Sequence, residues 1–368
     1  MKRVLVIGGY GNFGSFIAKE LVKDKHIQLI IAGRSLEKAN RLIENEIEAY
    51  HQPEAAQVDI HKNFPNALQQ IKPDIVIHTS GPFQAQSYHV ANACIDCGAD
   101  YIDLADGREF VAGITALYEK AKQAGVTIIS GASSVPCLTS AIVDQYIDEF
   151  TTLENLDYGI TTAQKTTRGL ATTAAILGYT GKIFRTLING KSTDVYGWQG
   201  LKARKFHRLG FRLLGHCDIP DLALFPQRYP TIKTLRFYAG LEIKFIHLIL
   251  WVLSWLVRTG LIDNLRKSAP LLLRLSFLFD WMGTASSGFY MELSGEGENR
   301  SKKSILFELV AHSGDGPYIP CMPAILLAKK LANGQRVEKG AYPCVDLISY
   351  DEYIGALKAL DITWHVTQ

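Results

Sequence analysis

Four glycines near the start of the chain have a spacing that suits a bound phosphate group. They lie in the segment Gly8, Gly9, Tyr10, Gly11, Asn12, Phe13 and Gly14, between the apolar run of residues 4–7 and a stretch with helical apolar spacing. Glycine allows a sharp turn, a close approach of the backbone to a pyrophosphate, and tight packing of the next helix. The N–H groups at the start of that helix would face the phosphates. The spacing therefore predicts a dinucleotide site formed by these seven residues.

The end of the second predicted strand indicates which dinucleotide is bound. NAD enzymes place Asp or Glu there, about 20 residues beyond the glycine turn, to bind the ribose 2′-hydroxyl. This chain instead has Gly33, Arg34 and Ser35. An arginine fork suits a 2′-phosphate, which a carboxylate would repel. We therefore expect NADP(H) bound by Arg34 and Ser35; the alternative is that Arg34 is an ordinary solvated surface charge.

Two further segments come where strands should end beside the cofactor. Asp59 closes the third predicted strand, near the expected adenine, and Ser80, Gly81 and Pro82 follow the fourth, on the side of the nicotinamide ribose. Asp59 has the alternative of a helix cap or a turn residue. The Gly-Pro pair has the alternative of a simple turn.

Hydride transfer also needs a proton donor or an electrophile beside the substrate. Asp103 and Asp106 flank the end of the fifth predicted strand, while Lys165 and Arg168 come where the first long strand of a second domain should end. We take Asp106, Lys165 and Arg168 as the catalytic candidates. Each has a structural alternative, because Asp often caps helices and Lys or Arg often lies on the surface. Asp315 is read as a turn by composition.

Several other classes of protein are disfavoured. The net charge of +3 is too small to indicate a nucleic-acid partner, and no spaced His, Cys and Asp set predicts a metal site. Six cysteines in 368 residues do not form a secreted disulfide framework, and the pair Cys94 and Cys97 lies within a helical stretch. The N-terminal sequence lacks the pattern of a signal peptide. We expect a cytoplasmic protein.

The elements that would position these residues alternate between strand and helix. Strands are predicted at residues 4–7, 28–32, 55–59, 74–79, 101–104 and 126–129, with Ser35 capping a helix over residues 36–47. This order predicts an α/β fold whose N-terminal domain is a doubly wound parallel sheet.

The segments GGYGNFG, AGRSLEKA, DIVIHTSGPF, CIDCGADYIDLADG, SGDGPYIPCMPAILLAKKLANG and GAYPCVDLISYDEYIGALKALDITW resemble those of the saccharopine dehydrogenase-like oxidoreductases. The resemblance spans nearly the whole chain and is tightest in the first 135 residues and from His312 onward. It implies a Rossmann domain that binds NAD(P) and an α+β second domain like the C-terminal domain of glyceraldehyde-3-phosphate dehydrogenase. By its position in the family, Asp315 would lie in a loop on the substrate side. The resemblance does not imply saccharopine as the substrate. The middle of the chain differs from the amino-acid-metabolising members because it contains a long apolar stretch.

Beyond residue 135 the strand-helix rhythm gives way to hairpin patterns. Asn189-Gly190 marks a tight hairpin, and residues 289–293 and 305–309 alternate as paired antiparallel strands. Ser349 and Glu352 have the spacing of a capping box. We expect a Rossmann domain over residues 1–135 and an α+β substrate and dimerisation domain with a mostly antiparallel sheet over residues 136–335. A C-terminal segment, residues 336–368, is expected to return to the first domain by analogy with the family.

A long apolar stretch covers residues 245–281, in two parts separated by Arg258, Asp263, Arg266 and Lys267. The first part, residues 245–257, is thirteen residues long, which is too short to span a bilayer, and a helical hairpin is the simplest arrangement. It is read as a core or dimer-interface hairpin, with a membrane-facing or lipid-binding hairpin as the alternative. The basic cluster Lys202, Arg204, Lys205, His207, Arg208 and Arg212 favours an anionic membrane surface, although a solvated charged face explains it more simply.

Together these features predict an NADP(H)-dependent oxidoreductase and homodimer, which acts on a carbonyl, imine or enoyl small molecule that is polar or apolar. The alternative is a non-enzymatic NADP-binding scaffold or sensor with peripheral membrane or lipid contact.

Overall fold

The structure is a computed structural model that describes residues 1–335 and 337–368. The chain divides into two compact units. The first unit comprises Met1–Ala141 and Tyr318–Tyr353, and the second comprises Ile142–Pro317 and Ile354–Gln368. The C-terminal part of the chain therefore contributes to both units.

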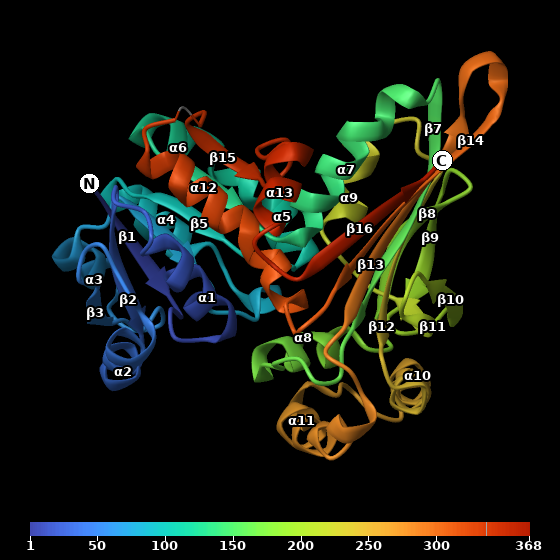
Figure 1. Cartoon of the computed structure of the whole chain (residues 1–368), viewed down its shortest axis with the longest axis horizontal. Helices are drawn as coiled ribbons and strands as arrows, with labels where there is room; N and C mark the ends of the chain where they lie inside the picture. Colours follow the sequence, from blue (N-terminus) through green and yellow to red (C-terminus); the bar gives the residue numbers. More distant parts are fainter. Residues whose placement is uncertain (336) are drawn as a thin grey trace. The chain divides into compact units, whose positions relative to one another are not determined.

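The first unit is built on a parallel sheet in the order β15-β6-β5-β4-β1-β2-β3 (Figure 1). Its strands are β1 (Lys2–Ile7), β2 (Ile27–Gly33), β3 (Glu54–Gln57), β4 (Ile75–His78), β5 (Asp100–Asp103), β6 (Thr127–Ser130) and β15 (Gly340–Pro343). The central strands are buried along their length, which explains their continuous apolar sequences. All six strands predicted in the first half are present, and the doubly wound α/β fold is confirmed.

Helices connect these strands and cover the sheet. They are α1 (Asn12–Leu21), α2 (Leu36–Glu46), α3 (Phe64–Ile71), α4 (His89–Cys97), α5 (Arg108–Ala112), α6 (Tyr118–Ala124) and α12 (Met322–Ala332). The helix α7 (Thr139–Tyr146) crosses the boundary between the units. Ser35 caps α2 as predicted, because its hydroxyl accepts the N–H of Lys38 at 3.3 Å.

The second unit contains a mixed, mostly antiparallel sheet in the order β10-β11-β12-β7-β13-β14-β16. The strands are β7 (Thr152–Thr162), β10 (Lys202–Phe206), β11 (Gly210–His216), β12 (Thr234–Leu241), β13 (Ser287–Glu296), β14 (Lys302–Ala311) and β16 (Ile362–Thr367). Only β12 and β7 pair in parallel within the described sheet. The predicted antiparallel pair is confirmed, with Met291 opposite Phe307.

A separate hairpin and five helices complete the second unit. They are β8 (Ile183–Ile188), β9 (Lys191–Tyr196), α8 (Leu170–Tyr179), α9 (Asp221–Arg228), α10 (Lys244–Arg258), α11 (Ala269–Phe277) and α13 (Tyr350–Leu357), the last of which begins in the first unit. Asn189 and Gly190 form the tight turn between β8 and β9, as predicted. The capping box of α13 is also present, with Ser349 N–H donating to Glu352 at 2.9 Å and Glu352 N–H donating to the Ser349 hydroxyl at 3.3 Å.

The units divide the chain differently from the predicted domains. The first boundary lies after Ala141 rather than residue 135, and residues 318–335 lie in the first unit rather than the second. The reason is that α12 packs against α1, and β15 extends the parallel sheet beside β6. The predicted C-terminal segment is shared, because β16 extends the second sheet beside β14. Arg336, its first residue, lies outside the described residues.

Candidate dinucleotide site

The first sheet reverses its strand order between β1 and β4. From β1 the chain continues to β2 on one side, whereas β4 and β5 follow on the other. Ligands of open parallel sheets bind at the carboxyl ends of the strands beside such a reversal. The predicted glycine segment begins directly after Ile7, the last residue of β1, and therefore lies at this position.

The glycine turn is packed too closely for larger residues. Gly8 has φ +77°, and a Cβ there would lie 2.6 Å from the Thr79 hydroxyl and 2.8 Å from the Ser80 hydroxyl. A Cβ on Gly14 would lie 2.2 Å from the carbonyl oxygen of Gly8. The turn, the start of α1 and the end of β4 are thus in direct contact. This arrangement gives the close backbone cradle that a pyrophosphate needs.

The N-terminus of α1 leaves its backbone N–H groups available. Gly11 occupies the cap position in an extended conformation, and within the described residues no side chain caps this helix. The first turn of α1 contains no acidic residue, and Asn12 is exposed. The positive end of the helix dipole is therefore not neutralised by an acidic residue in the helix's own first turn. These features fit a bound diphosphate.

Tyr10 joins the glycine turn to the end of β2. Its ring lies so close to Gly33 that a Cβ there would be 2.6 Å from the ring atoms. Its hydroxyl oxygen accepts the backbone N–H of Ser35 at 2.9 Å. Arg34 lies between Gly33 and Ser35 and is exposed. Its guanidinium makes no hydrogen bond or ion pair with the residues that the structure describes. The side chain at the predicted 2′-phosphate position is therefore free to bind an anion.

The other predicted cofactor contacts lie at the same carboxyl edge of the sheet. Asp59 follows β3 and accepts the N–H of His61 at 3.0 Å, the geometry of a turn residue. Ser80, Gly81 and Pro82 follow β4, where the Gln86 side-chain amide donates to the carbonyl of Ser80 at 2.8 Å. The loop after β4 is thus fixed beside Gly8.

A buried polar network below this loop was not predicted from the sequence. Asp103 ends β5 and accepts hydrogen bonds at one carboxylate oxygen from Ala105 N–H at 2.9 Å, Ser130 hydroxyl at 3.0 Å and Gly131 N–H at 2.8 Å. Burial raises the pKa of Asp103 to about 6. This residue holds together the carboxyl ends of β5 and β6, a structural role.

His78 occupies the matching position on β4, directly opposite Asp103 in the strand register. Its Nδ1 lies 3.0 Å from the hydroxyl oxygen of Tyr101, and the side chain is fully buried. Burial, followed by the nearby His89, lowers the pKa of His78 to about 3. His78 is therefore neutral at physiological pH. The signal for it in the sequence was only a polar residue at the end of an apolar strand.

The structure places the catalytic candidates in different surroundings. Asp106, in the first unit, is exposed and accepts the Gln84 side-chain amide at 3.0 Å. Lys165 follows β7 in the second unit; it is exposed, and its side chain has no hydrogen-bond or ion-pair partner among the described residues. Arg168 pairs with Asp280 at 2.5 Å, and its guanidinium lies 4.6 Å from the centre of the Phe277 ring. Asp315 is a turn residue that accepts the N–H of Asp361 at 2.8 Å.

Three of the six members of the basic cluster at residues 202–212 pair with carboxylates of the second unit. Lys202 pairs with Asp157 at 2.6 Å, Arg204 with Glu292 at 3.3 Å and Arg212 with Glu242 at 3.4 Å. Each partner lies far away in the sequence, so the pairs could not be foreseen. These three cations therefore form neither a solvated charged face nor a membrane-binding patch.

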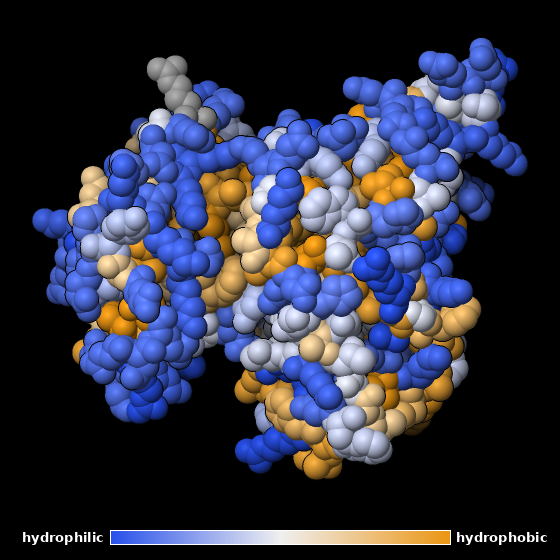
Figure 2. All heavy atoms as spheres, in the orientation of Figure 1, coloured by the Kyte–Doolittle hydropathy of each residue, from blue (hydrophilic) through white to orange (hydrophobic). Residues whose placement is uncertain are grey.

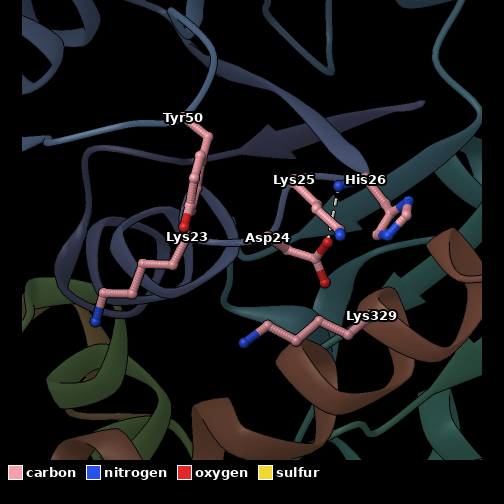
Figure 3. A pocket seen from close by; sticks show the side chains of 6 residues that line it. All are labelled: Lys23, Asp24, Lys25, His26, Tyr50 and Lys329. Atoms are coloured by element: carbon pink, nitrogen blue, oxygen red, sulfur yellow. Dashed lines mark hydrogen bonds between the residues drawn. The ribbon is translucent and has the colours of Figure 1, made fainter.

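An open hollow of about 300 Å³ lies at the opposite edge of the first sheet. It is lined by Lys23, Asp24, Lys25, His26, Tyr50 and Lys329 (Figure 3). Four of these residues connect the end of α1 to the start of β2, so the hollow lies at the amino ends of the strands. It is therefore separate from the dinucleotide site at the carboxyl ends.

The described residues form neither a metal-binding cluster nor a bilayer-spanning helix. Residues 1–335 and 337–368 contain no group of three or more His, Cys, Asp or Glu side chains placed to hold a metal ion. In the same ranges, none of the helices has the length and apolar character needed to cross a bilayer.

Part of the first unit is similar to a known nucleotide-binding domain. Residues 4–129 match the family model described as the saccharopine dehydrogenase NADP binding domain. The chain is 28% identical over 149 residues to the saccharopine dehydrogenase-like oxidoreductase of Homo sapiens, which covers 36% of this chain and 35% of that protein. It is 24% identical over 146 residues to an Arabidopsis thaliana protein described as a probable mitochondrial saccharopine dehydrogenase-like oxidoreductase, covering 36% and 32%. The match thus spans about a third of each relative.

A solved structure shares the fold over the whole chain. The apo histidine-tagged saccharopine dehydrogenase (L-Glu forming) of Saccharomyces cerevisiae superimposes with a TM-score of 0.70 over 100% of both chains, at 13% sequence identity. The resemblance to the saccharopine dehydrogenase-like oxidoreductases is therefore confirmed: residues 4–129 match the model of their NADP binding domain, and the whole chain shares the fold of a saccharopine dehydrogenase.

Proposed function

We propose that this protein is an NADP(H)-dependent oxidoreductase. The cofactor assignment rests on Arg34, which directly follows β2, where an NAD enzyme would have a carboxylate. Its guanidinium is exposed and has no partner among the described residues. A guanidinium forms strong charge-assisted hydrogen bonds with a phosphate. The hydrogen bond from Ser35 to Tyr10 fixes the backbone beside Arg34.

The residues of the first unit would each hold a different part of the cofactor. The glycine turn and the N-terminus of α1 would bind the pyrophosphate, Arg34 and Ser35 the 2′-phosphate, and the loop of Ser80, Gly81 and Pro82 the nicotinamide ribose. The bound nicotinamide supplies or accepts a hydride. Asp103 and His78 keep the strand ends below it rigid through their buried hydrogen bonds.

The substrate of this reaction would be a carbonyl, imine or enoyl compound. Among the second-unit candidates, Lys165 is the better proton donor, because its side chain is exposed and has no partner among the described residues. Arg168 acts instead as a positioning residue, since its pairing with Asp280 and its contact with Phe277 hold the loop in place. Asp106 remains the candidate on the first unit.

The preference for NADP(H) is tested by titrating the purified protein with NADPH and with NADH and following nucleotide fluorescence. We expect NADPH to bind at least about tenfold more tightly, because only NADPH carries the 2′-phosphate. Equal affinities, or a preference for NADH, would contradict the cofactor assignment.

The enzymatic assignment has its own test, because a non-enzymatic scaffold or sensor would bind NADPH equally well. NADPH oxidation is measured against a panel of ketones, imines and enoyl compounds that includes apolar members. Turnover of any of them supports the oxidoreductase. NADPH binding without any turnover across the panel would favour the scaffold.

A further inference from the structure

We propose that exposed apolar side chains of α10, of α11 and of the segments that directly follow these helices dock this protein on an anionic lipid surface. The docking face consists of large apolar side chains that are exposed on the chain: Phe245, Leu248, Ile249, Val252, Trp255, Leu261, Leu271, Leu275, Phe277, Leu278, Trp281 and Met282. Figure 2 shows apolar side chains gathered over these two helices. Contiguous apolar surface of this kind marks an interaction site in a folded protein. The proposal does not depend on the cofactor preference.

The helical part of the docking face is the exposed side of two helices whose other sides pack against the rest of the second unit. In α10 the buried residues are His247, Leu250, Ser254 and Val257, which recur every three or four positions and pack against β11 and β12. The α11 helix packs against α8 rather than along α10. The predicted helical hairpin is therefore two helices that pack on different elements, and Phe245 of α10 contacts Phe279 just beyond the end of α11. Neither helix needs a partner to hold its conformation.

Three members of the docking face are especially exposed, and one of them is a tryptophan. Trp281 is 77% exposed, Leu261 75% and Leu278 65%. Tryptophan prefers the boundary between lipid headgroups and acyl chains, because its ring is apolar and its N–H group is polar. With 15 residues, α10 is too short to cross a bilayer, so these helices would lie in the plane of the surface.

The charges around the docking face select the lipid. Residues 244–282 contain five cations, Lys244, Arg258, Arg266, Lys267 and Arg274, and all five are exposed. The same segment contains two acids, Asp263 and Asp280, and Asp280 is paired with Arg168. Basic residues beside an inserted apolar face attract phosphatidylserine and other anionic lipids.

The same charges disfavour a second copy of the chain as the occupant. A two-fold dimer brings each surface patch against its own copy. The five cations of one docking face would then lie near the five cations of the other, with few acids to compensate them. An anionic bilayer offers both an apolar layer and the opposite charge.

The docking face is connected to the loop that carries Lys165. The side-chain amide of Gln164 donates to the carbonyl of Ser276 in α11 at 2.8 Å, and Lys165 N–H donates to the carbonyl of Thr284 at 2.9 Å. Docking at a lipid surface would therefore act directly on the loop with the candidate proton donor. This connection fits an oxidoreductase with an apolar substrate.

The test is flotation of the full chain with vesicles of phosphatidylcholine alone or mixed with phosphatidylserine. We expect flotation with the mixed vesicles, at least about tenfold less with phosphatidylcholine alone, and a decrease with rising salt. The double variant Leu278→Ser with Trp281→Ser should lose flotation by at least about tenfold. The double variant Arg266→Glu with Lys267→Glu should lose the preference for phosphatidylserine.

The controls separate loss of docking from loss of folding. Phe211→Ser removes another exposed apolar residue of the second unit, outside the docking face, and should float like the unmodified protein. NADPH affinity should be unchanged in all variants, because the nucleotide site lies in the first unit. The proposal would be overturned if the protein does not float, or if the docking-face variants float as well as the unmodified protein. A stable dimer that does not float and that Leu278→Ser with Trp281→Ser converts to monomers in sedimentation would overturn it as well.

Discussion

The hydroxyl oxygen of Tyr10 accepts the backbone N–H of Ser35 at 2.9 Å. This hydrogen bond joins the glycine turn after β1 to the end of β2, on either side of the expected adenosine ribose. Because the Tyr10 ring also covers Gly33, the backbone on both sides of Arg34 is held by one side chain. The position of Arg34 thus depends on Tyr10.

Replacement of Tyr10 by Phe should weaken NADPH binding. The variant keeps the ring over Gly33 and removes only the acceptor for Ser35 N–H, a loss of about 1 kcal/mol or roughly fivefold in affinity. Fluorescence titration with NADPH and NADH measures it, and NADPH should be affected more than NADH. An unchanged NADPH affinity would show that the hydrogen bond does not position the 2′-phosphate site.

Replacement of Gly14 by Ala should disrupt the nucleotide site. The new Cβ would lie 2.2 Å from the Gly8 carbonyl oxygen, so α1 must move away from the turn that holds the phosphates. We expect NADPH affinity to fall by at least about tenfold and thermal stability to decrease. Gly355→Ala is the matched control, because Gly355 is exposed in α13 and a Cβ there meets nothing within 4 Å. That control should retain binding and gain a little stability, and equal losses in both variants would refute the packing argument.

Asp103 should make the stability of the fold depend on pH in the acidic range. Its pKa is about 6 in the folded chain and 3.8 when unperturbed, so between these values the folded state binds a proton that the unfolded state does not. The contribution of Asp103 to stability is therefore present at low pH and is lost as pH rises through 6. Relative to Asp103→Asn, the unmodified chain should gain about 2 kcal/mol between about pH 7 and about pH 4.5.

Urea unfolding of both proteins at the two pH values, followed by circular dichroism, provides this comparison. The difference removes the titration of His78 and all other groups that the two proteins share. A stability difference that does not change with pH would mean that Asp103 is ionised in the folded state at both values.

Lys165 should affect turnover without affecting cofactor binding. With any substrate found in the NADPH oxidation panel, Lys165→Met should lower kcat by a factor of about 100 to 10,000, because a general acid is removed. Lys191→Met, in the exposed turn region of the β8–β9 hairpin, is the control and should retain full activity. Activity that survives this substitution would assign the proton donor elsewhere, with Asp106 as the next candidate.

Features encoded by neighbouring residues could be predicted from the sequence. The glycine turn, the Ser35 cap, the Asn189-Gly190 hairpin and the Ser349–Glu352 capping box each involve residues at most a few positions apart. Their chemistry is local, so spacing alone specifies them. The same holds for the buried strands of the first sheet, whose continuous apolar runs require cover on both faces.

Features that depend on distant residues could not be predicted in the same way. The sequence near β15 and β16 does not reveal which sheet each strand joins, and these two strands extend different sheets. The partners of Lys202 and Arg204 likewise come from β7 and β13. The contact between His78 and Tyr101 depends on the register of β4 and β5, which the sequence does not state.

If Arg34 selects the 2′-phosphate, removal of its side chain should weaken the binding of NADPH and spare that of NADH. The affinities for NADPH and NADH are measured for the unmodified protein, for Arg34→Ala and for Arg41→Ala, whose arginine is exposed on the adjacent α2 and paired with Glu37. We predict that Arg34→Ala weakens NADPH binding by about 1–3 kcal/mol and leaves NADH binding unchanged, while Arg41→Ala changes neither. Equal weakening of NADPH and NADH binding in Arg34→Ala, or no weakening of either, would show that Arg34 does not select the 2′-phosphate.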